Sequence, residues 1–240
     1  MKFTTYVAVD REHWPELELA LLSWRKFCPA IIENPLVAIV DERFSLPPLC
    51  HPNVQVVRPA IKGGFCESQR ERMLTALSLE PANCQTEWFL KLDTDTVASR
   101  RVNWPLEDWA ATNFAFVASP WSYTKPGSWL RDLDAWSNAM GFSRRPPSRS
   151  YVQRGGVEIA KCRRVISYAM LCRTSFAAEV ATWCGDRLPV PSQDTVYWYL
   201  AERLGWNYLA INMQKFGWQH CGSSVARVRS AVSAALTGGG

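Results

Sequence analysis

The stretch that decides the fold runs from Trp88 to Val97 and reads Trp-Phe-Leu-Lys-Leu-Asp-Thr-Asp-Thr-Val. Its first five residues are mostly apolar, which predicts a strand buried on both faces. Asp93 and Asp95 follow directly, and side chains two residues apart in an extended chain point the same way, about 6.5–7 Å apart. A slight turn at Thr94 would let both carboxylates approach one cation. The stretch therefore predicts a divalent-metal site at the end of a core strand.

A second Asp-x-Asp triplet, Asp132–Asp134, offers a comparison within the same chain. It lies among apolar residues at helical spacing, where side chains two residues apart diverge around the helix. We therefore predict a solvated helix face there, within a short helix over residues 128–140. Asp93 and Asp95 follow an apolar strand instead, and the alternative to a metal site is an ordinary turn at the strand end.

The remainder of the chain alternates strands and helices. This order predicts an α/β fold with a mostly parallel central sheet flanked by helices. Ligands of such sheets bind at the carboxyl ends of the strands, and Asp10, Asp41 and Asp93 all follow such ends. Apolar runs predict strands at residues 4–9, 36–40, 54–57, 88–92, 114–118, 165–172 and 208–211, and helical spacing predicts helices at residues 14–27, 67–79, 175–183 and 191–204.

Composition argues against several classes of protein. The 240 residues carry a net charge of +5 without a long basic run, which favours small anionic ligands over nucleic acid. No apolar run is long enough to span a bilayer, and charged residues at 10–12 interrupt the first apolar stretch, so we expect no signal peptide. The eight Cys are scattered without a zinc spacing, which is typical of reduced thiols. We expect a cytoplasmic protein, with peripheral contact with a membrane left open.

Several of these segments resemble those of a known family. The run Phe89–Asp95 resembles the Asp-x-Asp segment of GT-A glycosyltransferases, and Tyr6–Asp10 is similar to the first nucleotide-binding strand of that family. Val37–Asp41 resembles the second such strand, whose terminal acid often meets the base of the nucleotide. Pro191–Asp194 is similar to the later acidic motif of inverting members, and Gly217–His220 is similar to the segment that carries a metal-binding histidine.

The resemblance implies roles for individual residues. Mn²⁺ or Mg²⁺ would bind Asp93 and Asp95, with His220 as a third ligand, and Asp93 would also meet the ribose. Asp194 would take the proton from the acceptor hydroxyl, which implies inversion at the anomeric carbon. The further donor-binding residues that the resemblance implies are Val9, Asp10, Asp41, Arg70 and Thr94.

Each of these assignments has a structural alternative. A carboxylate at Asp194 also suits the first turn of a helix, which it stabilises by roughly 0.3–1 kcal/mol. A lone histidine such as His220 is commonly a structural hydrogen-bonding residue. Arg70 also fits a solvated helix face. The family usually has Glu where this chain has Gln193, and an amide can hydrogen-bond an acceptor hydroxyl but cannot act as the base.

We therefore predict a single GT-A-like, Rossmann-like domain over residues 1–224, with a nucleotide-binding half at 1–97 and an acceptor-binding half at 98–224. Residues 225–240 would be a basic, Ala-rich helix or a disordered tail. The resemblance implies metal-dependent transfer of a sugar from a nucleoside diphosphate donor, UDP by family frequency, to a hydroxyl of a glycan, lipid-linked or protein acceptor. One alternative is a non-catalytic sugar- or nucleotide-binding relative. Another is a nucleotidyltransferase, but such enzymes usually have a glycine-rich loop where this chain has Arg11–His13.

Overall fold

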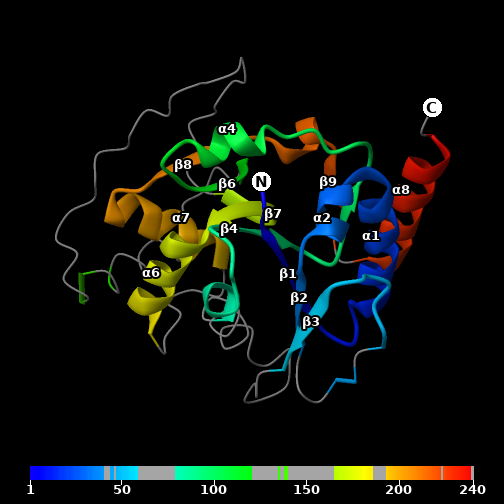
Figure 1. Ribbon diagram of the computed structural model, residues 1–240, viewed down its shortest axis with the longest axis horizontal. Helices are drawn as coiled ribbons and strands as arrows, with labels where there is room; N and C mark the ends of the chain where they lie inside the picture. The colour runs from blue at the N-terminus through cyan, green and yellow to red at the C-terminus, as the bar shows by residue number, and fades with distance from the viewer. Residues whose placement is uncertain are drawn as a thin grey trace.

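The largest element of the fold is a seven-stranded sheet. The computed structural model describes residues 1–40, 44–45, 47–58, 79–120, 135, 138–139, 165–185, 193–222 and 224–238. The strands of the sheet are β1 (Thr4–Val9), β2 (Leu36–Val40), β3 (Val54–Val57), β4 (Trp88–Leu92), β6 (Phe114–Pro120), β7 (Val165–Arg173) and β8 (Asn207–Ala210). They lie in the order β3-β2-β1-β4-β7-β6-β8 (Figure 1).

Most neighbouring strands of the sheet are parallel. Strands β3, β2, β1 and β4 run in one direction, and β6 and β8 are also parallel to each other. Strand β7 is antiparallel to both of its neighbours, β4 and β6, so β6 runs in the same direction as β4. Every residue of β2 is buried, as expected of a strand covered on both faces. The predicted α/β fold with a mostly parallel sheet is confirmed.

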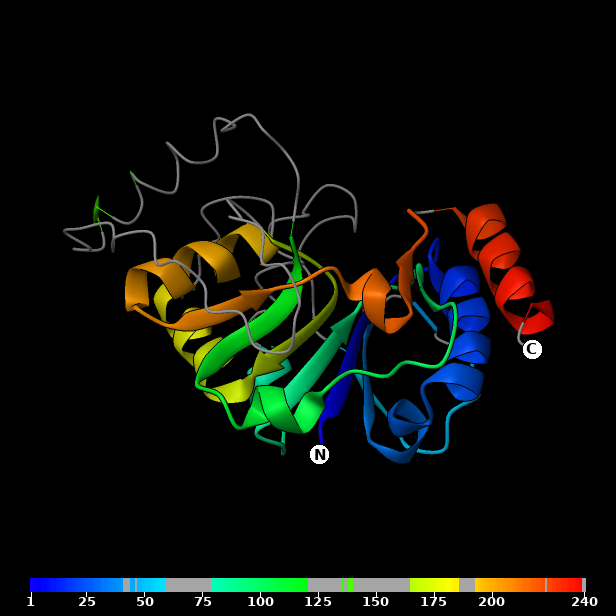
Figure 2. The same ribbon diagram turned by 90° about the horizontal axis from the view of Figure 1, so that it is seen from above.

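Helices cover both faces of the sheet (Figure 2). They are α1 (Trp14–Phe27), α2 (Pro29–Glu33), α4 (Leu106–Ala110), α6 (Thr174–Cys184), α7 (Gln193–Leu204) and α8 (Val225–Thr237), with a 3-10 helix, η1 (Met213–Phe216). Leu17 and Trp24 of α1 pack in the hydrophobic core on one face, and Phe176 of α6 and Leu200 of α7 pack in the core on the other. Helix α8 lies beside α1. In the described part of the chain, no helix has the length and apolar character needed to cross a bilayer.

A short antiparallel ribbon stands beside the main sheet. It pairs β5 (Thr96–Ala98) with β9 (Trp218–His220), and Thr96 lies opposite His220. Helix α1 holds this ribbon, because the Trp24 indole N–H donates to the Thr96 carbonyl (2.8 Å). Gly217 starts the turn into β9 with a φ of 101°, and a Cβ there would lie 2.9 Å from the Arg100 carbonyl oxygen. Both the backbone angle and the available space therefore require glycine at this position.

The predicted bounds of β1, α1, β2, β3 and β4 agree with the structure, and those of β6, β7, α6 and β8 differ by one or two residues. The sequence analysis did not predict α2, α4, β5, η1 or β9. The tail after residue 224 forms a helix, whose N-cap is the Ser224 side chain. Of the helices predicted at 67–79 and 128–140, nearly all residues lie outside the described ranges, and so do Asp132 and Asp134.

Candidate active site at the end of β4

The turn after β4 brings the two aspartates together. The backbone N–H of Asp93 donates to the Tyr168 carbonyl (3.0 Å), and the Asp93 carbonyl accepts the backbone N–H of Thr96 (3.0 Å). The Thr96 hydroxyl donates to the same Tyr168 carbonyl (2.8 Å). These three hydrogen bonds close a tight turn around Thr94, between the end of β4 and the start of β5.

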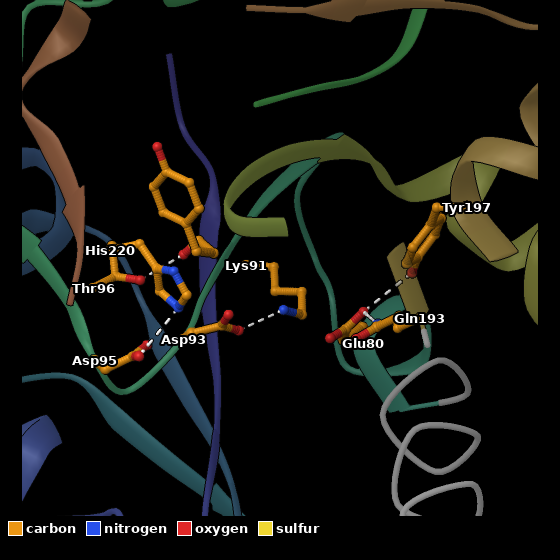
Figure 3. Close-up of polar contacts among 9 residues, drawn as sticks. Glu80, Lys91, Asp93, Asp95, Thr96, Gln193, Tyr197 and His220 are labelled. Carbon is orange, nitrogen blue, oxygen red and sulfur yellow. Dashed lines mark hydrogen bonds and ion pairs between the residues drawn. The ribbon is translucent and has the colours of Figure 1, made fainter. Parts of the chain in front are cut away.

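Asp93, Asp95 and His220 gather at this turn (Figure 3). One ligand atom from each lies within 4.8 Å of the other two. His220 reaches the aspartates because β9 pairs with β5, and its Nε2 lies 3.1 Å from Asp95 Oδ2. The Asp95 side chain is 5% exposed, whereas those of Asp93 and His220 are 40% and 33% exposed. The cluster is therefore buried at Asp95 and open to solvent at Asp93 and His220.

The donor set of this cluster fits a divalent cation. Asp95 Oδ2 is buried. Among the described residues, none donates a well-aligned hydrogen bond to this oxygen, and its partner is His220 Nε2 at ion-pair distance. Burying a carboxylate is costly unless it is paired, and a bound cation would add to the pairing that His220 gives Asp95. The contact with Asp95 raises the pKa of His220, so a cation would compete with a proton for this imidazole. Carboxylate oxygens with one imidazole are ligands that suit Mn²⁺ or Mg²⁺.

Lys91 is the charged residue within the otherwise apolar β4. Its ammonium group donates to Asp93 Oδ1 at 2.7 Å, and its side chain is only 11% exposed. Burial would lower the pKa of Lys91, but the carboxylates of Asp93, Asp194 and Glu80 outweigh burial and raise it. Lys91 is therefore a permanent positive charge among these carboxylates.

A second polar cluster lies on the other side of Lys91 from Asp95 and His220 (Figure 3). Glu80 is only 2% exposed, and its Oε2 accepts hydrogen bonds from Gln193 Nε2 (2.7 Å) and from the Tyr197 hydroxyl (3.1 Å). Burial raises the pKa of Glu80 to about 7, against the opposing effects of Lys91 and of both hydrogen bonds. Since Gln193 and Tyr197 belong to α7, Glu80 fixes the start of that helix.

Asp194 lies half-buried in the first turn of α7. Its charge acts on Lys91 and on Asp93, so its carboxylate lies close to the cluster that contains Asp93. Removal from water raises the pKa of Asp93, and Asp194 adds to this effect while Lys91 opposes it. The position also suits a carboxylate that stabilises the helix N-terminus, and the role of Asp194 as a base stays a prediction.

Asp10 follows β1 and is buried. Its Oδ1 accepts the backbone N–H of His13 (2.7 Å) and lies 2.6 Å from His13 Nδ1. This contact shapes the turn before α1 and gives Asp10 a structural role. Val9 is fully buried, so a ligand would reach it only through its backbone. Donor binding by Val9 and Asp10 stays a prediction.

Another buried carboxylate, Glu16 of α1, contacts the turn at Thr94. The Thr94 hydroxyl donates to Glu16 Oε2 over a long 3.4 Å, and both residues are buried. Burial raises the pKa of Glu16, and the nearby charges of Asp95 and Asp10 add to this while His13 opposes it. Burial and the neighbouring carboxylates thus disfavour the ionised form of Glu16.

The structure describes part of the predicted site. It brings Asp93, Asp95 and His220 together and places Asp194 and Thr94 nearby. Asp41 and Arg70 lie outside the described residues. The sequence analysis missed Glu80, Lys91 and Tyr168 as members of the site. Of these, only Lys91 left a signal, because a charge in the middle of a buried strand needs a partner.

An open pocket of about 580 Å³ lies beside the cluster, between β9 and α8. His220 and Cys221 form one wall, and Ser230 and Ala234 of α8 form part of another. Arg227 supplies a positive charge at its lining. The pocket is large enough for a sugar-sized ligand in contact with His220.

Comparisons with known proteins identify the fold. No family model and no curated protein matches the chain. Among solved structures, the chain is similar to the galactosyltransferase LgtC in complex with donor and acceptor sugar analogues. The two sequences are 12% identical, the TM-score is 0.53, and the match covers 86% of this chain and 73% of LgtC. An active-site mutant of LgtC matches with 11% identity, a TM-score of 0.52, and coverage of 87% and 72%.

The mannosyltransferase Ktr4p from S. cerevisiae is similar as well, with 10% identity and a TM-score of 0.54. That match covers 84% of this chain and 65% of Ktr4p. These neighbours are glycosyltransferases, and the predicted GT-A-like fold is confirmed. At such low identity the likeness is one of fold.

Proposed function

We propose that this protein is a metal-dependent glycosyltransferase that moves a sugar from a nucleoside diphosphate donor to a hydroxyl acceptor. The observation that carries the proposal is the cluster of Asp93, Asp95 and His220 at the carboxyl end of β4 in a GT-A-like fold. Ligands of parallel α/β sheets bind at that edge. The buried Asp95 Oδ2, which has only the ion pair with His220 in the described ranges, supports a cation there.

The cation would be Mn²⁺ or Mg²⁺, held by Asp95 and His220, with Asp93 shared between the metal and the donor ribose. Bound there, it would supply positive charge that stabilises the departing diphosphate. The donor would be a UDP-sugar, with further contacts from Thr94, from the backbone at Val9 and Asp10, and from Asp41 and Arg70. LgtC with donor and acceptor sugar analogues is the neighbour that supports sugar ligands.

Asp194 would act on the acceptor. Its carboxylate would take the proton from the attacking hydroxyl, which gives inversion at the anomeric carbon. Lys91 lies near this carboxylate, since the charge of Asp194 acts on the Lys91 ammonium group. Glu80 would keep the start of α7, and hence Asp194, in place through its hydrogen bonds to Gln193 and Tyr197.

The acceptor would be a hydroxyl of a glycan, a lipid-linked sugar or a protein. A lipid-linked acceptor would bring the protein to a membrane surface, which a peripheral contact would allow.

One observation favours a second candidate, a non-catalytic sugar- or nucleotide-binding protein. Gln193 stands where the resembling family usually has Glu, and its amide is buried and already bonded to Glu80. Gln193 therefore offers no acid or base, and catalysis would rest on Asp194 alone.

Release of nucleoside diphosphate from a panel of nucleotide sugars, with and without Mn²⁺, tests the proposal. Mn²⁺-dependent release is expected from the wild-type protein, and Asp194→Asn should lower it about 10²–10⁴-fold. Asp108→Asn is the matched control, because Asp108 is exposed on α4. Undiminished release by Asp194→Asn would remove Asp194 from its role. Donor binding without turnover for any acceptor favours the non-catalytic candidate.

A further inference from the structure

Tyr168 of β7 contacts both halves of the candidate metal site. Its carbonyl accepts hydrogen bonds from the Asp93 backbone N–H (3.0 Å) and from the Thr96 hydroxyl (2.8 Å), which fix the turn that carries the aspartates. Its ring stacks on the His220 imidazole with 5.2 Å between centroids and 12° between planes. One buried residue thus links the aspartate turn to the histidine on β9.

The Tyr168 ring is itself held from behind. Its hydroxyl accepts a hydrogen bond from Ser119 Oγ (3.0 Å), and Ser119 Oγ accepts the backbone N–H of Met213 (3.0 Å). Tyr168 is 5% exposed and Ser119 is 4% exposed. Strand β6 and helix η1 therefore fix the position of the ring that faces His220.

His220 needs such support. It stands at the end of a three-residue strand, and its side chain is 33% exposed. A metal-binding histidine is usually oriented by a hydrogen bond from its second ring nitrogen to a carboxylate or carbonyl. Among the residues that the structure describes, no acceptor serves Nδ1 of His220 in this way. Besides the contact of Nε2 with Asp95, the parallel Tyr168 ring restricts the plane of the imidazole.

We propose that Tyr168 is the positioning residue of the metal site: its ring holds His220 so that Nε2 faces Asp95, while its carbonyl holds the turn at Asp93. This inference rests on the metal site of the proposed function. Tyr168 does not bind the metal and acts only through His220 and the turn. Because a side-chain substitution leaves the carbonyl in place, the ring's part can be tested separately.

The test measures Mn²⁺ binding, without any substrate, in wild type, Tyr168→Phe and Tyr168→Leu. Loss of a residue that orients a metal ligand typically weakens metal binding about 10–100-fold, and this is expected for Tyr168→Leu. Tyr168→Phe keeps the stacked ring but loses the hydrogen bond from Ser119, so it should weaken Mn²⁺ binding much less than Tyr168→Leu. Pulsed electron paramagnetic resonance should show nitrogen coupling from the bound imidazole in wild type and Tyr168→Phe, and no such coupling in Tyr168→Leu.

A double-mutant cycle with His220→Ala separates positioning from general destabilisation. If Tyr168 acts through His220, then His220→Ala combined with Tyr168→Leu should bind Mn²⁺ no more weakly than His220→Ala alone. Phe116→Leu is the matched control, because it removes a ring stacked on Tyr208 (4.9 Å, 15°) in the core on the other face of the sheet. It should leave the Mn²⁺ affinity unchanged.

Circular dichroism checks that each variant folds, and Tyr168→Met, which has a flexible side chain without a ring, replaces Tyr168→Leu if the latter does not fold. Equal Mn²⁺ affinity and unchanged nitrogen coupling in wild type and the folded ring-less variant would overturn the role of Tyr168 while leaving the metal site intact. Fully additive losses in the double mutant would also overturn it. A wild-type protein that binds no Mn²⁺ removes the metal site, and the positioning role with it.

Discussion

Glu80 offers a quantitative prediction about stability. It is 2% exposed, and burial raises its pKa from an ordinary value of 4.5 to about 7. Below pH 4.5 the carboxyl is protonated in both states. As the pH rises toward 7, the unfolded chain releases this proton first, so the folded state loses stability. The loss is complete above pH 7, and at about 1.4 kcal/mol per pH unit it amounts to roughly 3 kcal/mol.

Glu80→Gln removes this dependence while keeping an oxygen that can accept from Gln193 and Tyr197. The variant should therefore gain roughly 3 kcal/mol relative to wild type between pH 4.5 and pH 8. Urea unfolding at several pH values, with a chelator present, gives the two free energies of unfolding. Glu107→Gln is the control, because that side chain is 90% exposed and is expected to leave the pH dependence unchanged. A free-energy difference between Glu80→Gln and wild type that is constant over this pH range would refute the reasoning.

Three other substitutions test the support of the site. Gly217→Ala places a Cβ on a residue with a φ of 101° and only 2.9 Å from the Arg100 carbonyl oxygen. The free energy of unfolding in urea should fall by about 1–3 kcal/mol, and Mn²⁺ binding should weaken because β9 carries His220. Trp24→Phe leaves the Thr96 carbonyl without its indole donor, so the free energy of unfolding should fall by about 1–3 kcal/mol; an unchanged value would show that this hydrogen bond does not hold the ribbon. Lys91→Met removes the ammonium group beside Asp93, Asp194 and Glu80. The melting temperature should therefore fall most at alkaline pH, where carboxylates are ionised, and an equal fall at every pH would contradict this.

The sequence predicted the parts of the fold that depend on local patterns. The bounds of β1, β2, β4 and α1 follow from continuous apolar runs or from helical spacing, and these signals are strong in a sheet covered on both faces. Strands β5 and β9 have three residues each and exist only because they pair with each other across more than a hundred residues. No local pattern encodes such a pairing.

The same distinction applies to the site. Asp93 and Asp95 directly follow a strand, so a metal site formed by both could be predicted from the local pattern. His220 was predicted as a ligand only from the resemblance to the family. The bond between Glu80 and Gln193 joins residues 113 apart in sequence, and the stacking of Tyr168 on His220 depends on two separate strand pairings. These contacts are set by tertiary packing, which the spacing of residue types does not reveal.

The central claim is that Asp95 and His220 bind a divalent cation at the end of β4. Anomalous diffraction from crystals grown with Mn²⁺ and UDP tests it most directly. We expect a manganese peak within coordination distance of an Asp95 carboxylate oxygen and of His220 Nε2, and no such peak in Asp95→Ala crystals. A fully occupied nucleotide with no peak at these two side chains would contradict it.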